Sequence, residues 1–195
     1  SYIDLTNNFT LNEDSLIACI SKKSKYSKLD FNAVAQGYSV DLVGDFLKTM
    51  GVENFLVEIG GELSSFGKNH ENKLWRVGIE KPIDSSYVGE FEFQKIILLD
   101  NQSLATSGNY RKFKVINGRK FSHSIDPKSG YPANNNLLSV TVVCQKAAIA
   151  DALATSFMVM GKDKAIDFLE SSSKDSIFCF MVYDSAKSLK EWSNF

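Results

Sequence analysis

The run from Ala150 to Met160 is apolar apart from one charged side chain, that of Asp151. Thr155 follows four residues later, so in a helix both side-chain oxygens face the same side. A carboxylate buried in such a helix is costly unless it is hydrogen-bonded, paired or bound to a metal. Mg²⁺ uses carboxylate and hydroxyl oxygens, often together with water and a substrate phosphate. The pair therefore indicates half of a site for a hard cation, or alternatively an acidic residue that complements the dipole of its own helix.

Three other segments combine small, polar or flexible residues in ways that could serve a ligand. The segment from Leu29 to Asp41 joins an expected strand to an expected helix, where the free backbone groups could receive a phosphate or be capped by Asp30 or Asn32. Gly60-Gly61-Glu62 follows an apolar strand, and its two glycines either allow a ligand to approach the backbone or simply end the strand. Leu104–Arg111 places hydroxyls and a glycine at a strand end and is by itself only a loop.

The two histidines differ in their surroundings. His70 lies in the polar tract Lys68–Lys73 and is expected to be a solvated loop residue. His123 follows an expected strand and precedes the rigid Asp126-Pro127 turn. A histidine held in this way could act as a general base near neutral pH, or it could be structural.

Composition excludes several classes of protein. The chain has 195 residues, of which 44% are hydrophobic and 12% aromatic, so it can bury a core and is neither disordered nor fibrous. Its net charge of −1 provides no basic surplus for non-specific binding to nucleic acid or anionic membranes. No apolar run reaches the roughly 18 residues of a membrane span. We expect one domain over residues 1–195, with any targeting segment lying outside this sequence, which opens at Ser1.

The cysteines Cys19, Cys144 and Cys179 all stand in apolar runs without a Cys-x-x-Cys pair. We therefore expect buried thiols, and neither a disulfide framework nor a zinc site.

Apolar periodicity predicts an α+β fold. Tyr38, Leu42, Phe46 and Met50 recur at helical spacing, which predicts a helix from Ala35 that ends at Gly51. Asn117-Gly118 between two strand-like runs indicates a hairpin. Because strands outnumber helices and do not alternate strictly with them, a largely antiparallel sheet with packed helices is expected. The further predicted helices are Ala147–Met160 and Lys162–Glu170. The predicted strands are Phe55–Ile59, Trp75–Ile79, Phe91–Leu99, Lys112–Ile116, Arg119–Phe121, Leu138–Cys144 and Ile177–Tyr183, with weaker strand signals near Tyr2–Leu5 and Leu16–Ile20.

The chemistry-bearing segments occur in an order that resembles the ApbE family of FAD:protein FMN transferases, formerly called thiamine-biosynthesis lipoproteins. The family pattern is similar to five motifs of this chain, which run from Asp30 to Thr155: Leu-Asp-x-x-Ala-x-Ala-x-Gly-Tyr-x-x-Asp, Gly-Gly-Glu, Thr-Ser-Gly-x-Tyr, His-x-Ile-Asp-Pro-x-x-Gly-x-Pro and Ala-Asp-Ala-x-Ala-Thr. Each motif is weak singly, and five in register are highly specific. The resemblance begins near Leu29 and extends to the C-terminus, and it implies that the chain is the C-terminal two-thirds of a family member.

The resemblance implies a T-fold-like core and a set of site residues. It implies a Mg²⁺ site made by the Asp151 carboxylate, the Thr155 hydroxyl and the backbone carbonyl of Ala33. That carbonyl is usable only if the regular helix begins after it. The resemblance further implies that His123 stands near the reacting phosphate, and that FAD is contacted or lined by Asp30, Gln36, Gly60, Gly61, Glu62 and Ile125. Position 36 is usually Lys or Glu in the family, so Gln36 is a departure that could weaken FAD binding or shift its selectivity.

The implied activity is Mg²⁺-dependent transfer of FMN from FAD to a Thr or Ser hydroxyl of an acceptor protein, with release of AMP. Three alternatives remain open: a pyrophosphatase that cleaves FAD to FMN and AMP, a non-enzymatic FAD-binding protein, and a structural fragment without a complete site. The resemblance also implies a bacterial, periplasm-facing location in the cell envelope, with any lipid anchor in an N-terminal portion that this sequence does not contain.

Overall fold

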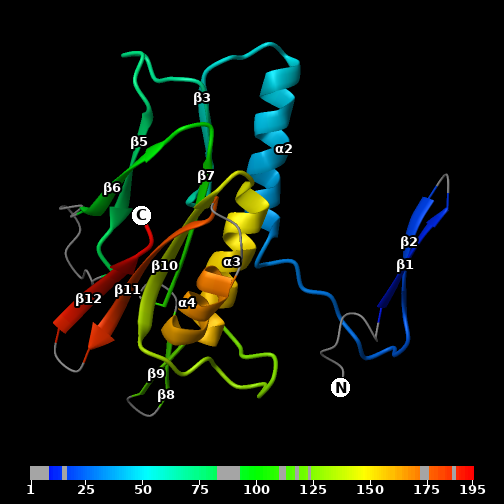
Figure 1. The fold of residues 1–195 in the computed structure, drawn as a ribbon. Helices are drawn as coiled ribbons and strands as arrows, with labels where there is room; N and C mark the ends of the chain where they lie inside the picture. The colour runs from blue at the N-terminus through cyan, green and yellow to red at the C-terminus, as the bar shows by residue number, and fades with distance from the viewer. Residues whose placement is uncertain are drawn as a thin grey trace.

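A computed structural model describes residues 9–14, 17–82, 93–109, 113–116, 119–122, 124–171, 176–185 and 188–195 of the chain. Its centre is a six-stranded sheet of spatial order β12-β11-β10-β7-β4-β3, in which every pairing is antiparallel (Figure 1). These strands are β3 (Phe55–Ile59), β4 (Glu62–Phe66), β7 (Ser103–Gly108), β10 (Leu137–Cys144), β11 (Phe178–Ser185) and β12 (Ser188–Ser193). The expected α+β fold with a largely antiparallel sheet is confirmed.

Three helices and three two-stranded hairpins complete the described chain. The hairpins are β1 (Phe9–Asp14) with β2 (Ile17–Lys22), β5 (Trp75–Glu80) with β6 (Phe93–Leu99), and β8 (Phe113–Ile116) with β9 (Arg119–Ser122). The helices are α2 (Ala35–Thr49), α3 (Ala147–Met160) and α4 (Lys162–Ser171). No helix in these segments is both long and apolar enough to cross a membrane.

The two faces of the sheet carry separate apolar cores. On one face, α3 contributes Ala150, Ala154 and Phe157 to a cluster with Val140 and Val142 of β10. On the other face, the β5–β6 hairpin packs against inward side chains of four sheet strands, in a cluster of Leu63, Ile79, Ile97, Leu99, Leu104, Val143, Phe180 and Val182. The alternation of side chains along each strand sends neighbouring residues to opposite cores. This two-sided burial explains why β10 is apolar except at Ser139 and Thr141.

The predicted element bounds mostly agree with the structure. Helix α3 has the predicted bounds, α4 is one residue longer than predicted, and α2 begins at the predicted Ala35. The two strands beside Asn117-Gly118 pair as a hairpin, although those two residues lie outside the described ones. Strands β1, β4 and β12 were not predicted, and the expectation of a loop from Leu104 is wrong, because Ser103–Gly108 form β7. The strand signal near Tyr2–Leu5 lies outside the described residues. Of the cysteines, Cys144 and Cys179 are buried thiols as expected, whereas the expectation of burial is wrong for Cys19, which is exposed on the β1–β2 hairpin.

The apolar stripe of α2 faces outward. Tyr38, Leu42, Phe46 and Met50 are all more than half exposed. The buried face of this helix instead carries Gly37, Val40 and Gly44. Small residues allow a helix to approach its neighbours closely, and Figure 1 shows α2 standing beside α3 on the helical side of the sheet.

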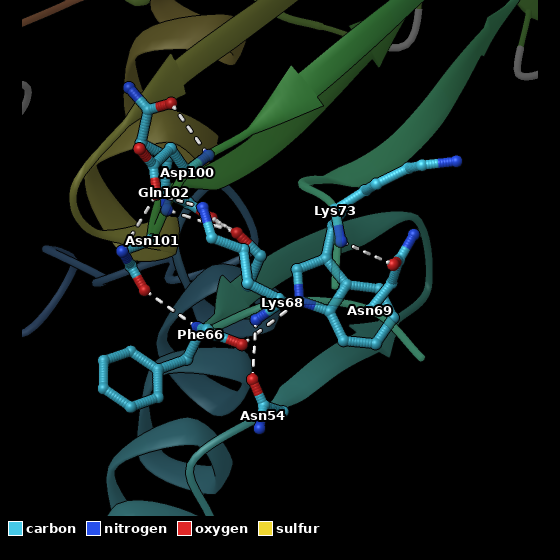
Figure 2. A network of polar contacts seen from close by, with 11 residues as sticks. Asn54, Phe66, Lys68, Asn69, Lys73, Asp100, Asn101 and Gln102 are labelled. Carbon is cyan, nitrogen blue, oxygen red and sulfur yellow. Dashed lines mark hydrogen bonds and ion pairs between the residues drawn. The ribbon is translucent and has the colours of Figure 1, made fainter. Parts of the chain in front are cut away.

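A polar network holds the end of β4 that lies away from Gly60-Gly61. The Asn101 side chain accepts a hydrogen bond from the Gly67 N–H at 2.8 Å, and the Asn54 side chain accepts one from the Lys68 N–H at 2.7 Å (Figure 2). The Trp75 indole N–H donates to the Phe66 carbonyl at 3.1 Å. These contacts join β3, β4, β5 and the start of β7 through backbone groups that a turn would otherwise leave unpaired.

Helix α3 receives its N-terminal cap from α2. Lys146, at the N-cap position, makes no capping hydrogen bond with its side chain. Instead, the Asp41 carboxylate of α2 accepts hydrogen bonds from the N–H groups of Ala147 and Ala148, at 2.9 and 3.0 Å. A carboxylate at this end also complements the positive pole of the α3 dipole. Asp41 therefore both caps α3 and ties it to α2.

Replacing Asp41 by Ala is expected to lower the free energy of unfolding by about 1–2 kcal/mol, because the two donors at the start of α3 lose their acceptor. Urea unfolding followed by circular dichroism measures this change. Asp45→Ala, one helical turn further along, is the matched control, since its ion pair with Lys146 is exposed and contributes little. Equal effects of the two substitutions would contradict the capping role.

Candidate functional site

The candidate site is a cavity of about 920 Å³ at the edge of the sheet. Its walls come from the start of α2, the Gly60-Gly61 turn between β3 and β4, strand β5, the end of β7 and helix α3. Strand β4 pairs with β7 only at Leu63 with Leu104 and Ser64 with Ser103, and β7 then continues to Gly108. The cavity therefore forms where β4 turns away and β7 goes on.

Asp151 lines this cavity and is 5% exposed. Its Oδ2 atom accepts a hydrogen bond from the backbone N–H of Gly37 at 3.1 Å. Burial raises the pKa of the Asp151 carboxyl, and the bond from Gly37 opposes that rise in part. Asp151 therefore complements the N-terminus of α2 and not, as the alternative interpretation had it, the dipole of its own helix.

The same hydrogen bond leaves the Ala33 carbonyl without its usual helical partner. In a regular helix the Gly37 N–H would donate to the carbonyl four residues earlier. Here α2 begins at Ala35, and that N–H turns to Asp151. The carbonyl of Ala33 accepts no hydrogen bond from the described residues. This is the condition under which a backbone oxygen at that position can serve as a ligand.

Thr155 lies one helical turn after Asp151 and also lines the cavity. Its hydroxyl shares a hydrogen bond with the Ser107 hydroxyl of β7 at 2.9 Å. In the described part of the chain, no three side chains of His, Cys, Asp or Glu are grouped so as to hold a metal. The donors that line the cavity here are instead the Asp151 carboxylate and the hydroxyls of Thr155 and Ser107, while the Ala33 carbonyl comes one turn before Gly37, the hydrogen-bond partner of Asp151. This set fits a hard cation such as Mg²⁺, which keeps several waters and binds few protein carboxylates.

Opposite these donors, Gln36 and Glu62 meet at the Gly60-Gly61 turn. Both glycines have positive φ, 65° at Gly60 and 103° at Gly61. A Cβ at Gly60 would overlap the Gln36 side-chain amide and lie 3.6 Å from Glu62 Oε2. Glu62 is 7% exposed and lines the cavity with both glycines and Gln36. The turn therefore needs glycine for its positive φ, and a side chain at Gly60 would in addition displace the Gln36 amide.

Not every predicted site residue lines the cavity. Asp30 is exposed and accepts a hydrogen bond from the Asn32 N–H at 2.8 Å, so the cavity wall is formed by Asn32 and not by Asp30. Ile125 is 51% exposed, and its neighbour Ser124 lines the cavity in its place. Ala33 lies between the lining residues Asn32 and Gln36 without itself lining the wall.

His123 lies outside the described residues, so its predicted catalytic role stays a prediction.

Sequence reasoning missed the contribution of β5 and the role of Gly37. Arg76, Gly78 and Glu80 line the cavity, yet their strand carries only an ordinary alternating pattern. A Cβ at Gly37 would overlap the Ala147 carbonyl and lie 2.8 Å from the Ala148 nitrogen. The Ala-x-Gly spacing near the start of α2 could have indicated such a close helix contact, because small residues permit it.

The comparisons with known proteins show the family of the chain. The model of the ApbE family matches residues 2–181, so the chain belongs to the ApbE family. The FAD:protein FMN transferase of Haemophilus influenzae is 39% identical over 164 residues, which are 84% of this chain and 46% of the relative. The FAD:protein FMN transferase of Vibrio cholerae is 37% identical over 175 residues, 90% of this chain and 50% of the relative.

Solved structures with the same fold cover nearly the whole chain. The flavin transferase ApbE from Vibrio cholerae superimposes with a TM-score of 0.80 at 34% identity, over 96% of this chain and 56% of that one. The apo form of the flavinyl transferase ApbE from Pseudomonas stutzeri gives a TM-score of 0.78 at 35% identity, over 96% of this chain and 54% of that one. The chain spans about half the length of the curated relatives it matches, and not the two-thirds that the resemblance implied.

The raised pKa of Asp151 predicts a pH dependence of stability. Because the folded protein disfavours the ionised carboxylate, the stability of the wild type relative to Asp151→Asn is greatest below pH 3.8, the ordinary pKa. It then falls as pH rises through the raised pKa of the folded state. Urea unfolding of both proteins in EDTA, at several pH values from about 3 to about 8, measures the difference.

Asp126→Asn is a control with the opposite sign. The Lys128 N–H donates to the Asp126 carboxylate and lowers its pKa, so the wild type gains stability relative to this variant as pH rises. A flat or rising difference for Asp151→Asn would show that burial does not disfavour its charge.

Proposed function

We propose that this chain carries the part of a flavin transferase that binds the cation and the diphosphate, and that the reaction is Mg²⁺-dependent transfer of FMN from FAD to a Thr or Ser hydroxyl of an acceptor protein. The observation that carries this proposal is the buried Asp151 carboxylate. It lies in a cavity beside Thr155 and accepts the hydrogen bond of the Gly37 N–H, which a regular helix would give to the Ala33 carbonyl. Membership in the ApbE family connects that arrangement with FAD.

The bond changes of the proposed reaction balance without a further reactant. The acceptor oxygen forms a bond to the FMN-side phosphorus of FAD, and the bond from that phosphorus to the bridging oxygen breaks. AMP leaves with the bridging oxygen, and the proton of the acceptor hydroxyl passes to a base. Bound Mg²⁺ supplies charge neutralisation at the diphosphate.

The residues of the chain have distinct tasks in this proposal. Asp151, Thr155 and the Ala33 carbonyl hold the cation, and the Gly37 N–H fixes the Asp151 carboxylate in place. The Gly60-Gly61 turn lets FAD approach the backbone, with Gln36 and Glu62 beside it. An amide at position 36 can donate and accept hydrogen bonds to a neutral part of FAD, where a charged residue would select an opposite charge. His123 accepts the proton, for which its ordinary pKa near 6.5 is suited.

Incubation of the chain with FAD, Mg²⁺ and a Thr-containing acceptor tests the cation site, with AMP release and acceptor mass as readouts. We expect Asp151→Ala and Thr155→Val to lower the rate, the former at least about a hundredfold, because stabilisation of charge by a metal is worth several kcal/mol. Ser156→Ala, which removes the neighbouring exposed hydroxyl of α3, is the matched control. AMP release without a change in acceptor mass would instead identify a pyrophosphatase, and FAD binding without AMP a binding protein.

His123→Ala is expected to lower transfer about 10²–10⁴-fold with little change in the Kd for FAD, since it removes a base and not a binding contact. His70→Ala is the control, because its side chain is 90% exposed. Unchanged transfer by His123→Ala would remove His123 from the mechanism.

A further inference from the structure

The last part of β7 has a strand neighbour on one side only. Toward β10, pairing runs without interruption from Ser103 with Cys144 to Gly108 with Ser139, and the Asn109 N–H then donates to the Leu138 carbonyl at 2.9 Å. Toward β4, pairing stops at Leu104. Within the described chain, Thr106, Ser107 and Gly108 therefore present an unpaired strand edge, and all three line the cavity.

This edge lies directly beside the candidate cation site. The Ser107 hydroxyl shares its hydrogen bond with Thr155, which places the middle of the edge next to the proposed metal ligands. Residues 105–108 read Ala-Thr-Ser-Gly, so no large side chain obstructs the approach of another backbone. An unpaired edge with small side chains is a template for an additional extended strand.

We propose that the acceptor polypeptide binds as an added strand along Thr106–Gly108. This inference rests on the proposed function, and it names the binding mode of the acceptor at the same site. Main-chain hydrogen bonds would hold the acceptor, as in other cases of strand addition. The acceptor hydroxyl would thereby reach the cation site without any recognition of its own side chain.

The faces of β7 determine which acceptor side chains point where. Ala105 packs in the core with α3, and Ser107 bonds to Thr155, so odd-numbered positions face the helical side. Leu104 packs in the core with β5, so even-numbered positions face the hairpin side. On an added strand, the acceptor Thr must point to the helical side to reach Thr155. The acceptor residues two positions before and after it would then point to the same side. Its immediate neighbours would point toward Val77 and Ile79, which also line the cavity.

Backbone N-methylation of a bound peptide tests this mode. The probes are capped hexapeptides with one central Thr flanked by combinations of Gly, Ala, Ser and Val, each also made with Ala in place of that Thr. In the best-bound peptide, each position is N-methylated in turn. We expect losses of affinity of about tenfold at alternate positions and little change between them, because only every second N–H of a strand faces its neighbour.

Hydrogen exchange supplies a readout that does not depend on chemistry. The Thr-to-Ala peptide cannot be modified, and it should still slow exchange of the outward amide or amides among Thr106–Gly108. The amides of β12, an edge strand far from the cavity in the order of the sheet, serve as the control. Failure of every peptide to slow exchange at β7, or losses without a two-residue period, would overturn the proposal.

The two proposals fail in distinguishable ways. FMN transfer to a peptide whose N-methyl scan shows no alternation would leave the transferase intact and exclude strand addition. Alternating losses and protection at β7 without any FMN transfer would support strand addition and exclude the transferase.

Discussion

The close contact between Gly37 and Ala147 controls how the two longest helices lie, and the site depends on it. With no side chain at Gly37, α2 reaches the backbone at the start of α3. At that distance each helix supplies a carboxylate to the N-terminus of the other: Asp41 to Ala147 and Ala148, and Asp151 to Gly37. Both carboxylates lie at positive helix poles, so the contact is electrostatic as well as steric. Any residue larger than glycine at position 37 would separate both pairs at once.

This exchange is unequal in a way that bears on function. Asp41 accepts two N–H bonds, whereas the more buried Asp151 accepts one and has a raised pKa. One hydrogen bond and a helix pole therefore do not offset the burial of the Asp151 charge. A bound cation would supply the missing stabilisation and would lower the proton affinity of the same carboxyl. The helix contact positions the Asp151 carboxylate in the cavity but provides too little positive charge to stabilise its ionised form. A carboxylate in that state is suited to bind a metal ion.

The sequence was sufficient for local features and insufficient for contacts between distant elements. Helix α3 could be predicted because its apolar run is long, and the β8–β9 hairpin because Asn-Gly favours its turn. The outward orientation of the α2 stripe could not, since periodicity finds a face without saying what covers it. The motifs also indicated Asp151 and Thr155, but not that Ser107 would meet Thr155 or that Arg76 would line the same cavity. Those facts depend on strand order, which no local pattern contains.

Two independent structural features form the site: the contact between α2 and α3, and the difference in length between β4 and β7. The helix contact sets Ala33, Gly37 and Asp151, while the unequal lengths of β4 and β7 create the opening in front of them. The Ser107–Thr155 hydrogen bond joins the two, since it links the sheet edge to the helix that carries the cation ligands. A longer β4 would pair with Thr106–Gly108 and fill the cavity, even with Asp151 and Thr155 unchanged. The early turn at Gly60-Gly61 is therefore as necessary to the site as the carboxylate itself, because it keeps the edge of β7 accessible beside Thr155.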